Sequence, residues 1–263
     1  MKPFLCAAVG VILSSLVMTP LASAAEDVKE ESFDKPEYVY SISRENTHEN
    51  MTRELPYLQP AELTTRLQET SDVIIDNPSL ISLLNESSIK DSKLAFGVNA
   101  SIYLGPWALT YESDETTMNW EYDLINTNEL DNRGGDTVGK LSYTQTENKL
   151  VEGELSSPVP QQEDVQNMMR IKATEKTSLP LSFHANIGNQ TTAGPMYQVQ
   201  PDQKGVVTSY VPAVHDQGTV TYGEVYVTIK GSKPAIVIKN IQEQQVDGWI
   251  PVKDYVTLKY HNG

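Results

Sequence analysis

The sequence predicts an α+β fold, made mainly of antiparallel β-sheet with a few short helices packed against it. Two observations lead to this class. From residue 94 onward, stretches rich in aromatic and β-branched residues indicate strands, and residues 219–230 alternate with the period of two that is typical of half-buried strands. Helical spacing occurs in only three stretches. The first two are so short that they gain stability only by packing their leucines on other parts of the chain.

The first 25 residues have the composition of a secretory signal peptide. Lys2 gives a positive start, and an apolar run extends from Leu5 to Leu21. Small residues then follow where signal peptidase cuts, namely Ala22, Ser23, Ala24 and Ala25. The run is short and acidic residues follow it at once, so it is a poor membrane span, and retention as an uncleaved anchor is the alternative. The sequence therefore predicts a protein that is secreted or held between membrane and cell wall, with no membrane span after cleavage.

Cys6 is the only cysteine of the 263 residues, and it lies inside the predicted signal peptide. Cleavage would leave a mature chain without a thiol, and therefore without disulfides. Exported eukaryotic domains often use disulfides. Their absence favours export from a bacterium, and a Gram-positive envelope in particular.

Residues 26–36 are charged and are predicted to form a flexible acidic linker. A single α+β domain is predicted to cover 37–263, with a division into two domains at the Pro-rich break 157–160 as the alternative. Alternation over 38–42 predicts a first strand. Two short helices are predicted next, one starting near Pro60 and one starting at Asn77-Pro78, a cap followed by a first-turn proline.

The rest of the chain is predicted to consist of strands and one longer helix, at 162–175. The predicted strands are 94–101, 102–111, 118–125, 138–146, 149–155, 179–187, 205–215, 219–230 and 256–260. Gly105-Pro106 is predicted to break a strand, Asp216-Gln217-Gly218 to form a turn, and residues 138–155 to form a hairpin. Residues 186–204 are predicted to be a long polar loop, a candidate functional loop by its position alone.

The charge balance bears on the class of partner. Lys and Arg number 20 and Asp and Glu number 35, which gives a net charge of −15. The predicted signal peptide holds only Lys2, so the mature value is 19 − 35 = −16. Such a charge repels nucleic acid, which is not predicted as a partner. It is compatible with cationic ligands, with calcium, or with solubility alone.

No motif assigns a catalytic residue, a metal or a cofactor. Four scattered histidines lack zinc-ligand spacing, and no serine or cysteine nucleophile motif is present. His215 and Asp216 lie at the end of a predicted strand, and adjacent strand side chains point to opposite faces, so they are not predicted to form a dyad. Residues 131–136 lack the spacing of a calcium loop and include Arg133, so a turn is predicted there.

Four residues are candidates for contact with a ligand or substrate. They are Trp107, Glu112, Trp120 and Glu121, because exposed aromatic rings stack on sugars and a pair of carboxylates can hydrolyse a glycosidic bond. The alternative is that both tryptophans belong to the core and that the acids merely face water.

Two functions of different classes follow. The first is a non-catalytic binding or interaction protein of the envelope or extracellular space, whose partner is an envelope protein or a wall component. The second is a carboxylate-dependent hydrolase acting on cell-wall or other polysaccharide. The hydrolase requires two acids about 5 to 10 Å apart in a cleft beside exposed aromatic side chains.

A set of short segments is spread over nearly the whole mature chain. They are Ser43–Thr47, Leu55–Pro60, Asn85–Ser88, Ile102–Gly105, Tyr111–Ser113, Asn119–Tyr122, Asp131–Gly135, Tyr222–Tyr226 and Trp249–Val252. Together these segments resemble the YfkD-like family of uncharacterised exported proteins from low-GC Gram-positive bacteria. The resemblance implies export and a single unit. It implies no activity, cofactor or site residue, because the family has none assigned.

The predicted export can be tested by mass spectrometry of the native protein. We expect protein recovered from the envelope or the medium to begin after the cleavage region, and to lack the peptide that contains Cys6, because signal peptidase removes it. Recovery of the protein from the cytosol with Cys6 still attached would contradict the predicted location.

Overall fold

The computed structural model describes residues 33–48, 50, 58–87, 99–231 and 233–263. These residues belong to one compact unit, Ser32–Gly263. The predicted signal peptide, including its cleavage region Ala22, Ser23, Ala24 and Ala25, and most of the predicted linker lie outside the described residues.

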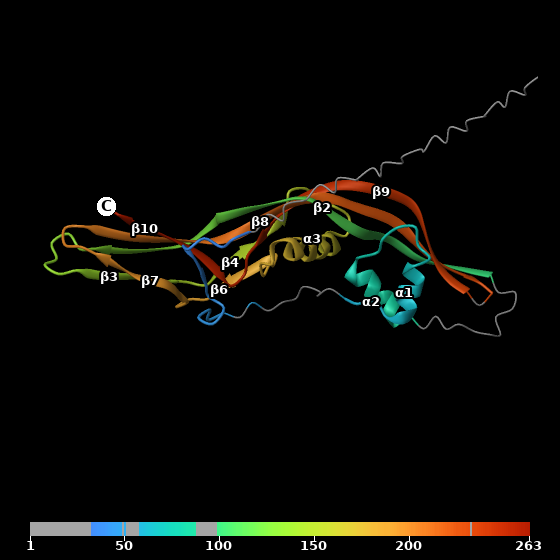
Figure 1. The fold of residues 1–263 in the computed structure, drawn as a ribbon, viewed down its shortest axis with the longest axis horizontal. Helices are drawn as coiled ribbons and strands as arrows, with labels where there is room; N and C mark the ends of the chain where they lie inside the picture. Colours follow the sequence, from blue (N-terminus) through green and yellow to red (C-terminus); the bar gives the residue numbers. More distant parts are fainter. Residues whose placement is uncertain (1–32, 49, 51–57, 88–98, 232) are drawn as a thin grey trace, which may run out of the picture. The chain divides into compact units, whose positions relative to one another are not determined.

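The described part of the chain confirms the predicted α+β class, because antiparallel strands dominate and its three helices are short (Figure 1). The elements in chain order are β1 (Val39–Ser41), α1 (Glu62–Gln68), α2 (Pro78–Glu86), β2 (Asn99–Asp131), β3 (Gly139–Thr144), β4 (Lys149–Glu152), β5 (Glu154–Leu155), α3 (Gln162–Thr177), β6 (His184–Ile187), β7 (Thr192–Val199), β8 (Lys204–Lys230), β9 (Lys233–Pro251) and β10 (Tyr255–Asn262).

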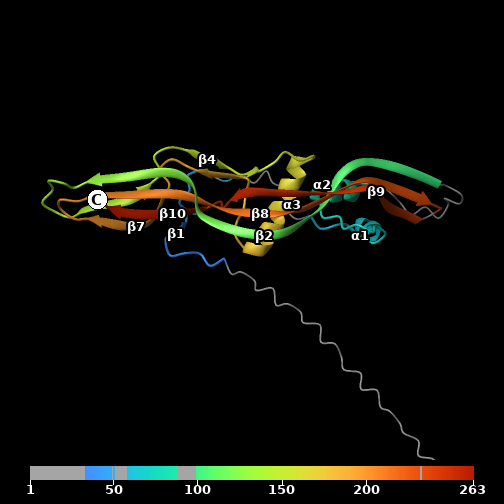
Figure 2. The ribbon, with the colours of Figure 1, turned by 90° about the horizontal axis from the view of Figure 1, so that it is seen from above.

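Strand β8 is the centre of the main sheet. On one edge it pairs with β2 from end to end. On the other edge it pairs first with β10 and then with β9. Figure 2 shows β2, β8 and β9 running beside one another for much of their length. Beyond these strands, β1 pairs with β10 and β5 pairs with β9. The backbone of β8 is therefore hydrogen-bonded inside the sheet on both of its edges.

Strand β2 contains more residues than the strand it pairs with. Its 33 residues lie along the 27 residues of β8, so the register accommodates 33 − 27 = 6 extra residues, at five irregularities. Such bulges bend a strand and increase its local twist. One of them follows Tyr103, where Gly105 adopts a φ of 105°. The predicted strand break at Gly105-Pro106 is therefore wrong, because the chain bends there without leaving the sheet.

The predicted turn at Asp216-Gln217-Gly218 is also wrong, because β8 continues straight through these residues. Long-range packing explains their identity. A Cβ atom at Gly218 would collide with the backbone carbonyl of Glu112 on β2, so glycine allows the two strands to approach closely at this point. The Asp216 side chain is fully buried.

Two other local predictions are wrong for a similar reason. Residues 138–155 do not form a hairpin, because β3 pairs with β7 and β4 pairs with β6. The predicted polar loop at 186–204 contains β7, which supplies the partner of β3. In both cases the strands pair with segments that are distant in the sequence, and the local polarity does not indicate this.

Three clusters of buried side chains lie along β8. The first packs α3 against Val214 and Val220 in the middle of the strand. The second surrounds Val207 and Val211 with β3, β4, β6, β7 and β10, and the third covers Val225 and Val227 with α1 and α2. The first cluster uses even-numbered residues of β8 and the other two use odd-numbered ones. Because successive strand residues point to opposite faces, α3 packs on the face of β8 opposite to the one that the other clusters use.

The three helices lie where the sequence predicts them, and α2 shows why. The Asn77 side-chain oxygen accepts hydrogen bonds from the backbone N–H groups of Ser79 (2.8 Å) and Leu80 (3.3 Å), as an N-cap does. The Asn77 amide also donates to the carbonyl of Ala108 on β2 (2.7 Å). The same residue therefore starts the helix and attaches it to the sheet.

A buried carboxylate joins β2 to β8 beneath α3. Asp216 accepts hydrogen bonds from the hydroxyls of Tyr111 (2.7 Å), Ser113 (2.7 Å) and Thr116 (2.6 Å). Lys176, near the end of α3, donates to the Ser113 hydroxyl (2.9 Å) and so brings a positive charge close to the network. Burial, and next the adjacent Asp216, raise the pKa of Tyr111 well above its ordinary value. The carboxylate is stabilised by three hydroxyl donors that come from one strand.

Removing this carboxylate is expected to destabilise the protein. Asp216→Ala leaves three hydroxyls in or beside the core without their acceptor, so we expect the free energy of unfolding to fall by about 3 kcal/mol. The adjacent variant Gln217→Ala is the control, because its side chain points to the opposite face and we expect a loss of about 0.5 kcal/mol or less. Urea denaturation measures both values, and equal losses in the two variants would contradict the role given to Asp216.

Candidate functional site

A row of side chains crosses three strands at the centre of the main sheet. The register places His215 of β8 opposite Trp249 of β9, and Trp249 opposite Glu154 of β5. Residues that pair directly across antiparallel strands project from the same face. Since Asp216 points into the α3 cluster, its neighbour His215 and the rest of the row project from the other face. Asp247, two residues before Trp249 on β9, shares that face.

A bulge in β2 adds a second aromatic ring to the row. The register of β2 shifts between Asn119 and Asp123, and this segment brings Tyr122 against Trp249. The Tyr122 and Trp249 rings are stacked, with centroids 5.1 Å apart and planes at 26°. The His215 ring lies 4.7 Å from Trp249. All three side chains are half-buried. Together, Tyr122, Glu154, His215, Asp247 and Trp249 form what we call the Trp249 surface.

The imidazole of His215 is held by a carboxylate and not by a nucleophile. Its Nε2 lies 3.2 Å from Oδ2 of Asp247, and the Ser156 hydroxyl donates to the same oxygen at 2.5 Å. The hydrogen bond from Ser156, with a smaller effect of His215, lowers the pKa of Asp247 below its ordinary value. A catalytic serine would instead donate to the imidazole. The arrangement therefore orients the histidine ring but does not activate Ser156.

Two further carboxylates stand beside the aromatic rings. Partial burial, and next the charges of Glu154 and Asp123, raise the pKa of Tyr122 above its ordinary value. Asp123 forms an ion pair with Lys149, with 3.6 Å between Nζ and Oδ2. Glu154 is exposed, and its carboxylate makes neither a hydrogen bond nor an ion pair with any residue of the described ranges. The edge of the Trp249 surface thus carries an unpaired negative charge.

The structure does not bring together Trp107 and Trp120, the two tryptophans predicted to contact a ligand. Trp107 is half-buried against the α1 and α2 cluster, and its indole N–H donates to the carbonyl of Leu104 (3.1 Å). Trp120 is half-buried against the α3 cluster. Trp107 lies opposite Gly223 of β8, whereas Trp120 follows the residue opposite Ala213. The two indoles are therefore separated by about ten residues of strand, or roughly 33 Å.

The two acids predicted to contact a ligand, Glu112 and Glu121, are also far apart. Glu112 lies opposite Thr219 of β8, and Glu121 lies in the bulge that spans Pro212. About seven residues of strand separate these positions, which corresponds to roughly 23 Å. Both acids are exposed, and Glu121 forms an ion pair with Lys259 at 2.5 Å. The separation of Glu112 and Glu121 therefore exceeds the range of about 5 to 10 Å that a hydrolase using these two carboxylates requires.

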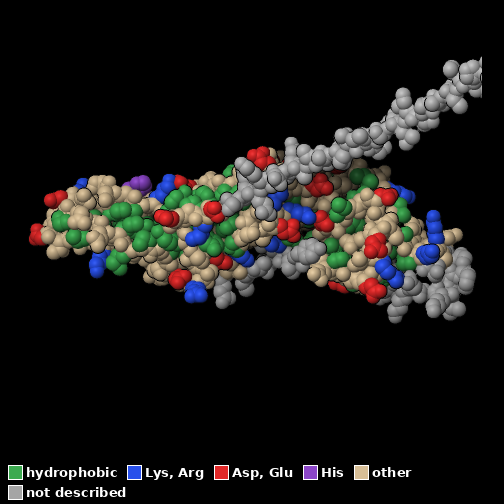
Figure 3. Space-filling model, viewed as in Figure 1, with side chains coloured by type: hydrophobic (Ala, Val, Ile, Leu, Met, Phe, Trp, Pro, Cys, Tyr) green, Lys and Arg blue, Asp and Glu red, His purple; other side chains and the backbone are tan. Residues whose placement is uncertain are grey.

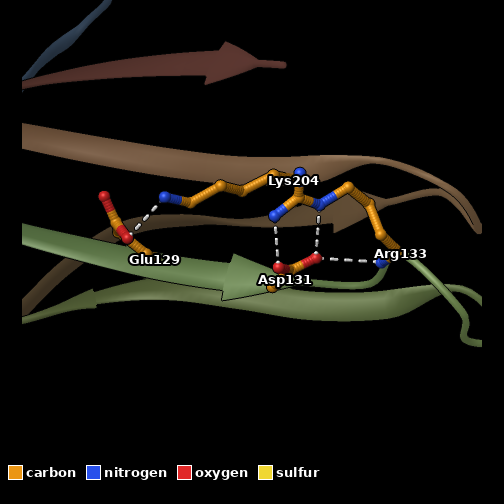
Figure 4. A network of polar contacts seen from close by, with 4 residues as sticks. All are labelled: Glu129, Asp131, Arg133 and Lys204. Carbon is orange, nitrogen blue, oxygen red and sulfur yellow. Dashed lines mark hydrogen bonds and ion pairs between the residues drawn. The ribbon is translucent and has the colours of Figure 1, made fainter.

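Residues 131–136 superficially resemble a calcium loop, but Arg133 forms an ion pair with Asp131 there (Figure 4). Both carboxylate oxygens of Asp131 accept hydrogen bonds from the Arg133 guanidinium, at 2.9 and 2.7 Å. This contact lowers the pKa of Asp131 below its ordinary range. Beside it, Lys204 pairs with Glu129 at 2.7 Å. Within the described residues, no group of three or more His, Cys, Asp or Glu side chains is arranged to hold a metal ion.

The Trp249 surface was not predicted from the sequence, although part of its signal is visible there. Val246 and Ile250 alternate with Asp247 and Trp249, which places the tryptophan on the face opposite to two buried residues. This alternation indicates that Trp249 is not a core residue of that face. Its neighbours come from β2, β5 and β8, and only the strand register identifies them.

Comparison with known proteins places the chain among relatives of unknown activity. The model of the family described as YfkD-like protein matches residues 36–263. The chain is 48% identical over 228 residues to the uncharacterized protein YfkD of Bacillus subtilis (strain 168), which covers 87% of this chain and 86% of that protein. A crystal structure of lamprey immune protein matches with a TM-score of 0.27 and 9% identity, over 62% of this chain and 53% of that one, and no conclusion rests on it.

Among the described residues, no helix combines the length and the apolar character needed to cross a membrane.

The hydrogen bond from Ser156 predicts the acid titration of Asp247. Because the folded-state pKa of this carboxyl is depressed, its contribution to stability is present above the ordinary value of 3.8 and is lost as the pH falls below it. We expect Ser156→Ala to raise the pKa of Asp247 toward 3.8 and to flatten this acid loss of stability. Carboxyl NMR titration measures the pKa. Ser157→Ala, a change at the adjacent exposed serine, should leave it unchanged, and an equal shift in both variants would refute the assignment.

Proposed function

This chain belongs to the YfkD-like family, and we propose that it works outside the cytoplasm as a non-catalytic binding protein. Its partner is an envelope protein or a wall component, and the Trp249 surface makes the contact. The proposal for the location rests on the first 25 residues, which have the order of a positive start, an apolar run and small residues typical of a signal peptide. Its acidic composition, with a net charge of −15, is compatible with a soluble exported protein.

The observation that carries the binding proposal is the half-buried Trp249, which contacts side chains from other strands. Tyr122 stacks on its ring and His215 contacts it, so the indole has a fixed orientation before any partner arrives. Tryptophan and tyrosine side chains dominate the binding energy of many interfaces, and a fixed side chain loses little conformational entropy on binding. The hydrogen-bonded strands of a large sheet provide the rigid support.

The same geometry favours binding over hydrolysis. Ser156 donates its hydrogen bond to Asp247, whose lowered pKa makes it a weak base, and not to the imidazole of His215. Glu112 and Glu121, the acids proposed for a hydrolase, stand roughly 23 Å apart along the sheet, where two carboxylates cannot act on one glycosidic bond. The side chains that do gather at the centre of the sheet are aromatic and acidic, and they are arranged for contact.

Sedimentation with purified envelope fragments from the producing cell tests this proposal. We expect the mature wild-type protein to co-sediment, and Trp249→Ala to bind about tenfold more weakly, because loss of a central aromatic side chain typically costs more than 1 kcal/mol of binding free energy. Circular dichroism and the urea midpoint must show that the variant is folded.

The matched control is Tyr103→Ala. Tyr103 is an aromatic residue with 53% of its surface exposed, and it pairs with Tyr226 far along β2 from the Trp249 surface. We expect this variant to sediment like the wild type. Equal binding by Trp249→Ala and the wild type, or equal weakening by both variants, would remove the support for this surface.

A further inference from the structure

Among the described residues around Trp249, the charged group without an ion-pair partner is negative. Glu154 lies directly across the strand pair from Trp249 and makes no ion pair within the described residues. Two basic side chains near the surface already have acidic partners, since Lys149 pairs with Asp123 and the His215 ring contacts Asp247. Acidic and basic side chains are interspersed over the face drawn in Figure 3. At the Trp249 surface, the unpaired carboxylate of Glu154 lies beside stacked rings.

Aromatic rings and carboxylates attract the same kind of group. The face of an indole or phenol ring carries a partial negative charge and binds cations, among which arginine is the commonest in proteins. A guanidinium is planar, so it can stack on a ring and donate paired hydrogen bonds to a carboxylate in the same position. A phosphate or carboxylate would be repelled by Glu154 and Asp247.

We propose that the Trp249 surface binds an arginine side chain presented by a protein partner. The guanidinium lies against the solvent-exposed part of the Tyr122–Trp249 stack and donates hydrogen bonds to Glu154. This proposal rests on the proposed function and specifies its ligand. It follows from charge complementarity at the site, where the aromatic rings supply the contact area and the unpaired Glu154 supplies the acceptor.

The test uses a short blocked peptide, acetyl-Gly-Arg-Gly-amide, and the same peptide with citrulline in place of arginine. Citrulline has nearly the same shape but no charge. We expect the arginine peptide to shift the Trp249 indole N–H resonance saturably in NMR titrations of the mature protein. We expect the citrulline peptide to bind at least about fivefold more weakly. Raising the salt concentration should weaken the binding of the arginine peptide and leave the binding of the citrulline peptide unchanged.

Variants identify the groups responsible. Glu154→Gln keeps the shape of the side chain and removes its charge, and we expect it to weaken the arginine peptide about fivefold. Glu112→Gln is the matched control, because Glu112 is an equally exposed acid on β2 away from the site, and it should have no effect. Equal binding of the arginine and citrulline peptides, or no effect of Glu154→Gln, would overturn the proposal.

One outcome separates this proposal from the proposed function. A neutral probe, the trimer of N-acetylglucosamine, is titrated in parallel. If it shifts the Trp249 resonance while the arginine peptide does not, the arginine proposal fails. Loss of envelope binding in Trp249→Ala would still support the surface itself. If Trp249→Ala leaves envelope binding unchanged, the proposed function fails, whatever the peptides do.

Discussion

The pairing of β8 on both of its edges is the constraint on which the rest of the structure depends. A strand of 27 residues that is hydrogen-bonded from end to end twists strongly, and its neighbours must follow it. β2 follows by adding six residues at five bulges. The three clusters of buried side chains each pack on a different stretch of β8, and α3 uses the opposite face from the other two. The Trp249 surface lies where one of these bulges brings the Tyr122 side chain of β2 against Trp249 of β9.

Local structure could be predicted from the sequence where local chemistry determines it. Asn77-Pro78 gives the start of α2, and the α3 range was predicted to within two residues. Asp216-Gln217-Gly218 predicts a turn that the structure lacks, because these residue types favour turns in isolation. Their true environment is set by Tyr111, Thr116 and the Glu112 carbonyl, about one hundred positions earlier in the chain. No window of neighbouring residues contains that information.

The candidate site depends even more on register than the fold does. Trp107 and Trp120 were chosen because tryptophans near acids suggest a sugar site, but ten residues of strand separate them and each packs on a different cluster. Trp249 stands in the sequence beside apolar residues that give no hint of a ligand. It becomes a candidate only when the register sets it between His215 and Glu154, and when a bulge sets Tyr122 on its ring.

The pairing of β2 with β8 also has a consequence for the order in which the chain can fold. The residues of β2 emerge during synthesis long before those of β8. Strand β10, which pairs with β1, emerges last. Until β8 has been synthesised, β2 has no sheet to join. Until β8 and β9 are present, α1 and α2 lack the surface that buries their leucines. Closing such long loops before any contact forms is slow. The first half of the chain can therefore complete its native strand pairing only after β8 has been synthesised.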